Sequence, residues 1–228
     1  GFCKIISSGL PLVTLKSAAS LDGRIATASG SSRWITAGLA RADSHLLRAQ
    51  HDAVMISSAT AIADNPQLTC RLPGMESRSP VRVLLDAQRR TSSSLGLFRS
   101  ANSVPLWVFT SIPVENKMNQ EALRIGAKIC VVDADKSGLG VDLKQTLKQL
   151  AKLGITRLLV EAGGKLAAAL MRDRLVDRVV IYRAASVIGG DGLPLVETLG
   201  IESASEALRL KLINCRPIGE DNVETYGV

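Results

Sequence analysis

Short apolar segments with strand character alternate with amphipathic helical segments along most of the chain. Strands are expected at residues 12–19, 52–58, 82–86, 105–110, 128–133 and 157–161, and helices at residues 36–50, 119–126, 142–154 and 165–176. Strand–helix–strand units place neighbouring strands parallel and cover them with helices. The alternation therefore predicts an α/β fold with a mostly parallel central sheet and helices on both faces.

The C-terminal part departs from this alternation. Residues 177–185 and 208–219 are strand-like, and the connection between them is poor in helix signals. Strands joined without a crossover helix pair antiparallel, so an antiparallel C-terminal edge is expected. No internal repeat or convincing internal linker interrupts the chain, and a single domain is the simplest organisation.

Two of the expected helices have readable ends. In residues 142–154, Asp142 is expected at the N-cap and Gly154 at the end. In residues 36–50, Thr36 is the expected N-cap. Residues 59–71, by contrast, are rich in turn signals. The apolar stripe of the 36–50 helix, expected to face the core, is Leu39, Leu46 and Leu47.

Composition excludes several classes of function. The four cysteines are scattered, and the two histidines, His45 and His51, are wrongly spaced for one helical face, so neither a metal site nor a Ser-His-Asp triad is expected. Free thiols fit a reducing compartment, and no apolar run is long enough to span a membrane. We therefore expect a cytoplasmic protein that does not insert into membranes.

The net charge of +7 suggests anionic partners, which include phosphorylated small molecules and nucleic acid. Aromatic residues make up only 3% of the chain, and no basic block is interleaved with aromatics. A surface for stacking single-stranded nucleic acid is therefore poorly supported.

The segment LLVEAGGKLAAAL joins a strand, two glycines and the start of a helix. Free N–H groups and the positive end of a helix dipole at such a junction suit an anion, and Gly163 and Gly164 would allow close approach. Glu161 stands at the strand tip, where open α/β sheets bind ligands. A tight turn without a ligand explains the glycines equally well.

Two further segments contain candidate ligand-binding residues. SSATAIADNPQLTCR places Thr60, Asp64 and Arg71 after a strand, although a surface turn is the simpler interpretation. SLDGRIATASGSSRWIT contains Trp34, and arginines such as Arg48 on the following helix would suit a phosphate clamp. For any single arginine a solvated position is the commoner case, and Trp34 has an alternative as a core aromatic.

Taken together, these segments resemble a known family. LKSAASLDGRIATASGSSRWIT, RADSHLLRAQHDAVMISSATAIADNPQLTCR, VRVLLDAQRR and LLVEAGGKLAAALMRDRLVDRVVIY, in this order, are similar to the reductase domain of the bacterial bifunctional riboflavin biosynthesis deaminase/reductase. The resemblance runs from about Leu12 to the C-terminal GEDNVETYGV. Each motif is modest alone, but their order and spacing are specific.

The resemblance implies a dihydrofolate-reductase-like fold and an enzyme that uses NADPH to reduce the ribosyl group of 5-amino-6-(5-phosphoribosylamino)uracil to ribityl. It also implies a homodimer. In this family a zinc deaminase domain lies upstream, and its H-x-E and P-C-x-x-C signature does not occur here. We expect residues 1–10 to be the remnant of an inter-domain linker and residues 11–228 to be the reductase domain, with reductase activity only.

The family's site residues transfer to this chain by matched position. Glu161 is an expected catalytic residue. Lys16 is added by a hypothesis about the mechanism and not by a matched position: it would assist proton transfer or ribose contacts, with a solvent-facing lysine as an equal alternative. The expected substrate positions are Ser32, Arg48, Leu68, Arg71 and Glu161. The expected cofactor positions are Ala18, Trp34, Thr60, Asp64, Ala87 (through its backbone), Gly163, Gly164, Lys165, Leu166, Ala167, Ala168 and Ala169.

Several alternatives stay open at this point. A related reductase acts before deamination, on the 2,5-diamino-6-ribosylaminopyrimidinone 5′-phosphate, and the sequence does not separate the two substrates. A dihydrofolate reductase would need an acidic residue to protonate the pteridine, for which we find no convincing candidate. A nucleic-acid-binding module and a non-catalytic remnant are the alternatives outside the enzyme class. No residue is pinned to the 2′-phosphate of NADPH, for which Arg89, Thr110 and Ser111 are candidates.

Overall fold

The computed structural model describes residues 1–228, and the chain divides into two compact units. Unit 1 comprises Gly1–Leu12 and His45–Leu159, and unit 2 comprises Val13–Ser44 and Val160–Val228. The chain therefore passes from one unit to the other three times. Each passage falls within an element: β1 (Leu12–Ala19) and β7 (Arg157–Glu161) begin in unit 1 and end in unit 2, and α2 (Gly38–Ala49) begins in unit 2 and ends in unit 1.

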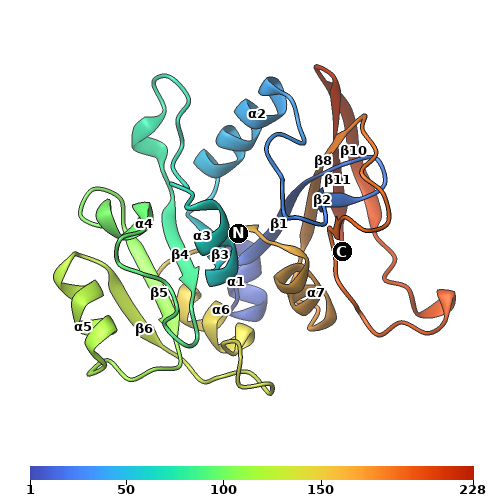
Figure 1. The fold of residues 1–228 in the computed structure, drawn as a ribbon. Coiled ribbons are helices and arrows are strands. Elements are labelled where there is room, and N and C mark those ends of the chain that lie inside the picture. Colours follow the sequence, from blue (N-terminus) through green and yellow to red (C-terminus); the bar gives the residue numbers. More distant parts are fainter. The chain divides into compact units, whose positions relative to one another are not determined.

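Unit 1 is built on four parallel strands in the order β3-β4-β5-β6, with α5 beside β6 (Figure 1). The pairing Ser57↔Leu85 and Leu85↔Phe109 places the carboxyl ends of β3, β4 and β5 next to one another. Its elements are α1 (Phe2–Ser8), β3 (Ala53–Ser57), α3 (Ser58–Asp64), η1 (Glu76–Arg78), β4 (Val81–Leu85), α4 (Gly96–Arg99), β5 (Leu106–Thr110), α5 (Lys117–Arg124), β6 (Lys128–Val131) and α6 (Leu143–Lys152).

The core of unit 1 consists of apolar side chains from these strands and the helices beside them. Val54, Ile56, Leu84 and Val108 are buried with Phe98 of α4. At 25 cal/mol per Å² of apolar surface, such side chains each contribute about 1.5–3 kcal/mol to folding. This core holds the strand ends, and with them the loops that follow, in fixed positions.

Unit 2 contains strands in the order β10-β11-β8-β1 and a separate two-stranded sheet, β2–β9. β1 and β8 are parallel, whereas β11 is antiparallel to both β8 and β10. Its elements are β1 (Leu12–Ala19), β2 (Arg24–Ala26), α7 (Gly164–Arg172), β8 (Arg178–Ala184), β9 (Leu193–Pro194), η2 (Ala204–Glu206), β10 (Lys211–Ile218) and β11 (Asp221–Gly227).

The predicted α/β class, with mostly parallel strands and an antiparallel C-terminal edge, is confirmed. The edge contains one strand more than expected, because β11 follows β10 after a tight turn and completes a hairpin. Residues 59–71 were expected to be turn, but α3 forms within them: Ser57 caps its start by accepting a hydrogen bond from Thr60 N, and Asn65 ends it with φ 42°. The Ser57 cap stabilises this short helix, which the sequence did not predict because turn-forming residues follow it directly.

Two expectations about α2 differ from the structure. Of the predicted leucine stripe, Leu47 packs against the core of unit 1 as expected, whereas Leu39 is 61% exposed and Leu46 is also exposed. The buried residues of the helix are Ala40, Ser44 and Ala49. The helix begins at Gly38, and the carboxylate that accepts the Ala37 N–H, at 2.7 Å, belongs to Asp221 of β11. A residue 184 positions away in the sequence replaces the local Thr36 cap that the sequence suggested.

Residues expected to be a linker remnant contain the helix α1, so this segment has its own regular structure. Its assignment as a linker stays a prediction. None of the helices is both long enough and apolar enough to cross a bilayer.

Candidate functional site

In unit 1, the C-terminal part of α2 binds the backbone of residues 69–71. The Arg48 guanidinium donates to the Thr69 carbonyl at 3.1 Å. The His45 ring nitrogen Nδ1 lies 3.0 Å from the same carbonyl and 3.3 Å from the Arg71 N–H. Two predicted substrate residues, Arg48 and Arg71, are therefore held close together, and the Arg71 side chain is exposed.

His45 is a residue that sequence reasoning missed, because histidines were considered only as metal ligands or triad members. Its spacing from Arg48, one helical turn, was the available signal. The ring fixes the main chain that carries Arg71, so its expected role is to position a cation and not to react.

Leu68 lies in the same segment but contributes differently. Its side chain is 2% exposed and belongs to the apolar core of unit 1, while its backbone adopts φ 57°. A left-handed conformation is unusual for a leucine. Only the main chain of Leu68 is available to the substrate position that the sequence analysis gave it.

The predicted cofactor residues of unit 1 lie at the carboxyl ends of β3 and β4. Thr60 is in the first turn of α3, where its Oγ1 is 3.3 Å from Ser57 Oγ, and Asp64 ends the same helix. The Ala87 carbonyl accepts hydrogen bonds from Thr110 Oγ1 at 2.9 Å and from Ser111 Oγ at 3.0 Å. Because these hydroxyls occupy the carbonyl, a backbone contact of Ala87 with a ligand would have to come from another atom.

In unit 2, Glu161 ends β7 and is followed by the start of α7. No side chain caps the α7 N-terminus at Gly163, and its first turn contains no acidic residue, whereas Asp142 caps α6. The side chains of Leu166, Ala167 and Ala168 are buried, and Lys165 is exposed. Uncapped amides at a positive helix end fit an anionic group such as a diphosphate.

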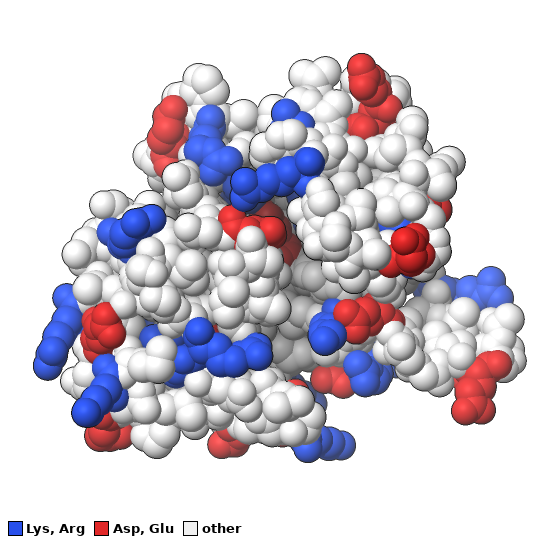
Figure 2. Space-filling model, in the orientation of Figure 1, with Lys and Arg blue, Asp and Glu red and all other residues white.

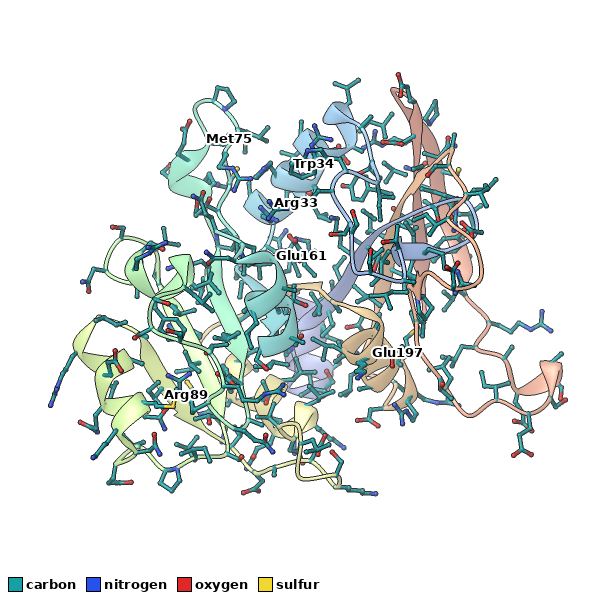
Figure 3. The ribbon with its side chains drawn as sticks, viewed as in Figure 1. Arg33, Trp34, Met75, Arg89, Glu161 and Glu197 are labelled. Carbon is teal, nitrogen blue, oxygen red and sulfur yellow. The ribbon has the colours of Figure 1, made fainter.

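Gly164 has a further, structural reason to be glycine. A Cβ at this position would lie 2.6 Å from the Pro194 carbonyl oxygen, and the Glu197 N–H donates to the Gly164 carbonyl at 3.1 Å. Glu197 is labelled beside α7 in Figure 3. Close packing against Pro194 and Glu197 therefore favours glycine at this position.

Lys16 and Ala18 are two residues apart on β1 and so face the same side of the strand. Lys16 Nζ lies 5.4 Å from the centre of the Tyr182 ring, and Tyr182 is also the pairing partner of Ala18 on β8. The Tyr182 hydroxyl donates to Asp43 at 2.8 Å, and Arg216 donates to the other oxygen of that carboxylate, also at 2.8 Å. The predicted catalytic lysine therefore packs against a hydrogen-bonded aromatic ring.

Burial, the hydrogen bond to Asp43 and its negative charge raise the pKa of Tyr182 far above the usual value for a tyrosine, and the Glu161 carboxylate adds to this effect. Tyr182 therefore stays protonated and acts as a hydrogen-bond donor. Lys16 and Glu161, the two expected catalytic residues, therefore both act on Tyr182. Neither Tyr182 nor Asp43 was singled out in the sequence, because a strand tyrosine looks like ordinary core.

Trp34 lies in the loop before α2, with Arg33 beside it (Figure 3). The indole is 70% exposed, and the Arg41 guanidinium lies 4.5 Å from its ring centre, so Trp34 is not a core aromatic. Ser32, two residues earlier, is half-buried. A cavity of about 310 Å³ opens here, lined by Trp34, Ile35, Thr36, Ala37, Arg41, Ala184, Ala185, Ser186, Glu220 and Asp221.

The structure thus groups the predicted residues into clusters within each unit. Arg48, Leu68 and Arg71 gather in unit 1, where Thr60 and Ala87 lie at neighbouring strand ends. Lys16, Ala18 and Glu161 gather near Tyr182 in unit 2, and Trp34 lines its own cavity. The fold that carries these clusters is an α/β fold with mostly parallel strands.

Comparisons with known proteins agree with this class. The RibD C-terminal domain family matches residues 11–223. The riboflavin biosynthesis protein RibD of Escherichia coli is 35% identical over 232 residues, which cover 97% of this chain and 61% of the relative. The solved structure of Acinetobacter baumannii RibD, form 1, has a TM-score of 0.86 at 30% identity and covers 99% of this chain and 60% of that one. The chain belongs to the RibD C-terminal domain family.

The lengths of the relatives differ. The chain spans about 60% of the length of its RibD relatives. In contrast, it spans 98% of the 2,5-diamino-6-ribosylamino-4(3H)-pyrimidinone 5′-phosphate reductase of Methanothermobacter thermautotrophicus, which is 34% identical over 220 residues, or 96% of this chain.

Proposed function

We propose that this chain is the NADPH-dependent 5-amino-6-(5-phosphoribosylamino)uracil reductase of riboflavin biosynthesis, which reduces the ribosyl group of its substrate to ribityl. The family match over residues 11–223 carries this proposal. A Thermotoga maritima relative of known structure, 28% identical, is described as a deaminase and 5-amino-6-(5-phosphoribosylamino)uracil reductase.

In this proposal Arg71 and Arg48 hold the phosphate or nearby oxygens of the substrate. Guanidinium groups bind phosphate oxygens through paired N–H donors. Arg48 donates to the Thr69 carbonyl and the Arg71 N–H donates to His45 Nδ1, so the main chain at Arg71 is fixed before the substrate arrives. Ser32 adds a hydroxyl, Leu68 its main chain, and Glu161 orients the pyrimidine or a ribose hydroxyl.

The uncapped N-terminus of α7 supports the cofactor assignment, since its amides suit the diphosphate of a dinucleotide. Residues Gly163 to Ala169 would hold that group, with Thr60, Asp64, Ala87, Ala18 and Trp34 as further contacts. When bound, NADPH supplies the hydride that reduces C1′ of the substrate. The protein contributes binding, orientation and electrostatics.

Lys16 is the proposed proton donor or ribose contact. Its ammonium group sits against Tyr182, whose own proton is retained, so Tyr182 holds Lys16 without competing as an acid. Glu161 supplies the negative charge in the same neighbourhood. A lysine and a carboxylate near one another suit the transfer of a proton during ribosyl reduction.

The second candidate is reduction of the 2,5-diaminopyrimidinone before deamination. The Methanothermobacter reductase, which this chain matches over almost its full length, favours it. The two substrates differ at one exocyclic group of the pyrimidine, and both carry the same ribose phosphate.

Steady-state rates with NADPH and each purified pyrimidine test the proposal. We expect the aminouracil to be the better substrate by at least tenfold in kcat/KM, about 1.4 kcal/mol of transition-state binding. A preference for the diaminopyrimidinone would support the second candidate. If neither pyrimidine causes NADPH oxidation, both candidate functions are excluded.

The proposed partners are a phosphorylated pyrimidine and a second copy of the chain, in the cytoplasm. A nucleic acid is not among them. On the face drawn in Figure 2, Lys and Arg side chains are interspersed with Asp and Glu, so the charge of +7 forms no continuous basic stripe there. Salt-dependent duplex binding without NADPH oxidation would contradict this proposal.

A further inference from the structure

The carboxyl ends of β3, β4 and β5 in unit 1 offer several groups to a phosphate. The residues expected to contact the cofactor there, Thr60 and Ala87, do not account for the choice of NADPH over NADH. That choice requires a donor for the 2′-phosphate of the adenosine ribose. The parallel register of the three strands brings the candidates for this role to one edge.

Arg89 is excluded by its surroundings. The residue is 4% exposed, and its guanidinium donates to Asn119 at 2.7 Å, to Asp86 at 3.2 Å and to the Met118 carbonyl at 3.2 Å. Figure 3 places it in unit 1 near α5. These bonds tie the loop after β4 to α5, so Arg89 is structural.

The two hydroxyl candidates are also occupied. Thr110 is fully buried, and its Oγ1 donates to the Ala87 carbonyl at 2.9 Å. Ser111 Oγ donates to the same carbonyl at 3.0 Å. A hydroxyl has a single proton to donate, so neither offers its O–H to a phosphate without breaking a bond inside the protein.

Arg90 differs from its neighbour in every one of these respects. Its side chain is exposed, and the described side-chain contact is one hydrogen bond from Nη2 to Ser58 Oγ at 3.3 Å. Its backbone N–H donates to the buried Asp86 carboxylate at 2.9 Å. The backbone is thus fixed and one edge of the guanidinium is tethered, while four of its five N–H donors stay available.

We propose that Arg90 binds the 2′-phosphate and so selects NADPH over NADH. Ser58, to which Arg90 is tethered, lies two residues before Thr60, and Arg90 lies three residues after Ala87. The cation is therefore held beside two of the three expected cofactor positions of unit 1, Thr60 and Ala87. Asp86 does not compensate its charge, because Thr91 N, Thr91 Oγ1 and Arg89 also bind that carboxylate. The inference rests on the proposed use of NADPH.

The test compares ligands with and without the 2′-phosphate. The affinities of 2′-AMP, 5′-AMP, NADPH and NADH are measured by calorimetry for the full chain and for Arg90→Ala, Arg90→Lys and Arg99→Ala. Arg99, in the last turn of α4, is the matched control because it is an exposed arginine outside the proposed site.

We expect Arg90→Ala to weaken 2′-AMP and NADPH by at least about tenfold, equivalent to about 1.4 kcal/mol, and to leave 5′-AMP and NADH unchanged. The affinities of Arg90→Lys for 2′-AMP and NADPH should lie between those of the parent and Arg90→Ala, since lysine keeps the positive charge but lacks the paired N–H donors of the guanidinium. Arg99→Ala should match the parent. Equal weakening of NADPH and NADH, or no weakening, would overturn the inference for Arg90.

These outcomes also separate the inference from the function on which it rests. If the parent chain reduces its pyrimidine with NADPH and Arg90→Ala keeps the same preference over NADH, only the inference fails. If the parent chain neither binds nor oxidises NADPH, the proposed function fails, and the inference with it.

Discussion

Arg71 presents its charge at the end of a segment that two side chains of α2 hold in place. Preorganisation of this kind lowers the conformational entropy that binding has to overcome, because the main chain beneath the guanidinium is already ordered. These hydrogen bonds involve the main chain of residues 69–71, so they remain when the Arg71 side chain is replaced. Removal of the guanidinium should therefore affect substrate binding and not folding.

We expect Arg71→Ala to lower kcat/KM by about 1.5–3 kcal/mol, chiefly through KM, because a charge-assisted contact to the substrate phosphate is lost. Steady-state kinetics with the aminouracil substrate measure this effect. Arg78→Ala, an exposed arginine in η1, is the matched control and should behave as the parent. Unchanged kcat/KM for Arg71→Ala would assign the phosphate to another residue.

At the scale of elements, the loop after β1 is tied to the loop after β8 by the Asp22 carboxylate and by the Leu21 N–H, which donates to the Ser186 carbonyl at 2.7 Å. Asp22 accepts hydrogen bonds from Ser20 Oγ at 2.6 Å, Gly189 N at 2.8 Å and Ile188 N at 3.2 Å. These donors lower the pKa of Asp22 from 3.8 to about 2. The segment SLDGRIATASGSSRWIT, in which candidate ligand-binding residues were predicted, therefore begins with an ordered turn.

A folded-state pKa below the unfolded value means that the ionised carboxylate stabilises the turn above pH 3.8 and that this stabilisation is lost as the pH falls through about 2. We expect the amide proton shifts of Ile188 and Gly189, followed by NMR, to titrate with a midpoint near 2. In Asp22→Asn this titration should disappear. A midpoint near the ordinary value for aspartate would contradict the hydrogen bonds.

Close packing at the start of α7 gives a second prediction for an element. In Gly164→Ala the new methyl group would meet the Pro194 carbonyl oxygen, and overpacking of this kind costs about 1–3 kcal/mol. Urea denaturation of the variant measures the loss of unfolding free energy. Gly190→Ala is the control, because its Cβ meets no atom within 4 Å. Equal stability of the two variants would show that the backbone around Pro194 moves away from the new methyl group at little cost in free energy.

Comparison of these elements with the sequence shows which signals are local. β1 was predicted at its observed bounds, and α6 has the predicted Asp142 cap, which accepts from Gln145 N at 2.7 Å. The residues that form a hydrophobic pattern or a helix cap of this kind are close together in the sequence, so these elements can be predicted from the sequence alone. Leu39 and the Asp221 cap were unpredictable, because burial and capping there depend on residues brought together from distant parts of the chain.

The candidate site follows the same rule. Matched motifs indicated Arg48, Arg71 and Glu161, and the structure places Arg48 beside Arg71. The residues that position them, His45 and Tyr182, carry no motif of their own. Their roles come from hydrogen bonds to a carbonyl 24 residues away and to a carboxylate 139 residues away, which a single sequence does not record.

At the scale of the whole molecule, neither unit is a continuous stretch of chain. A cut at any single peptide bond therefore leaves at least one unit incomplete. The family match over residues 11–223 spans both units. The assignment of residues 11–228 as a reductase domain stays a prediction.

The parallel pairing of β1 with β8 joins residues 14–19 to residues 178–183. During synthesis on the ribosome, β3, β4, β5 and β6 emerge in the order in which they pair, so their sheet can assemble while translation continues. β1 emerges first, whereas β8, its parallel partner, is synthesised only after β3, β4, β5, β6 and β7. We therefore expect the edge of β1 that pairs with β8 to need protection from non-native pairing until β8 has been synthesised.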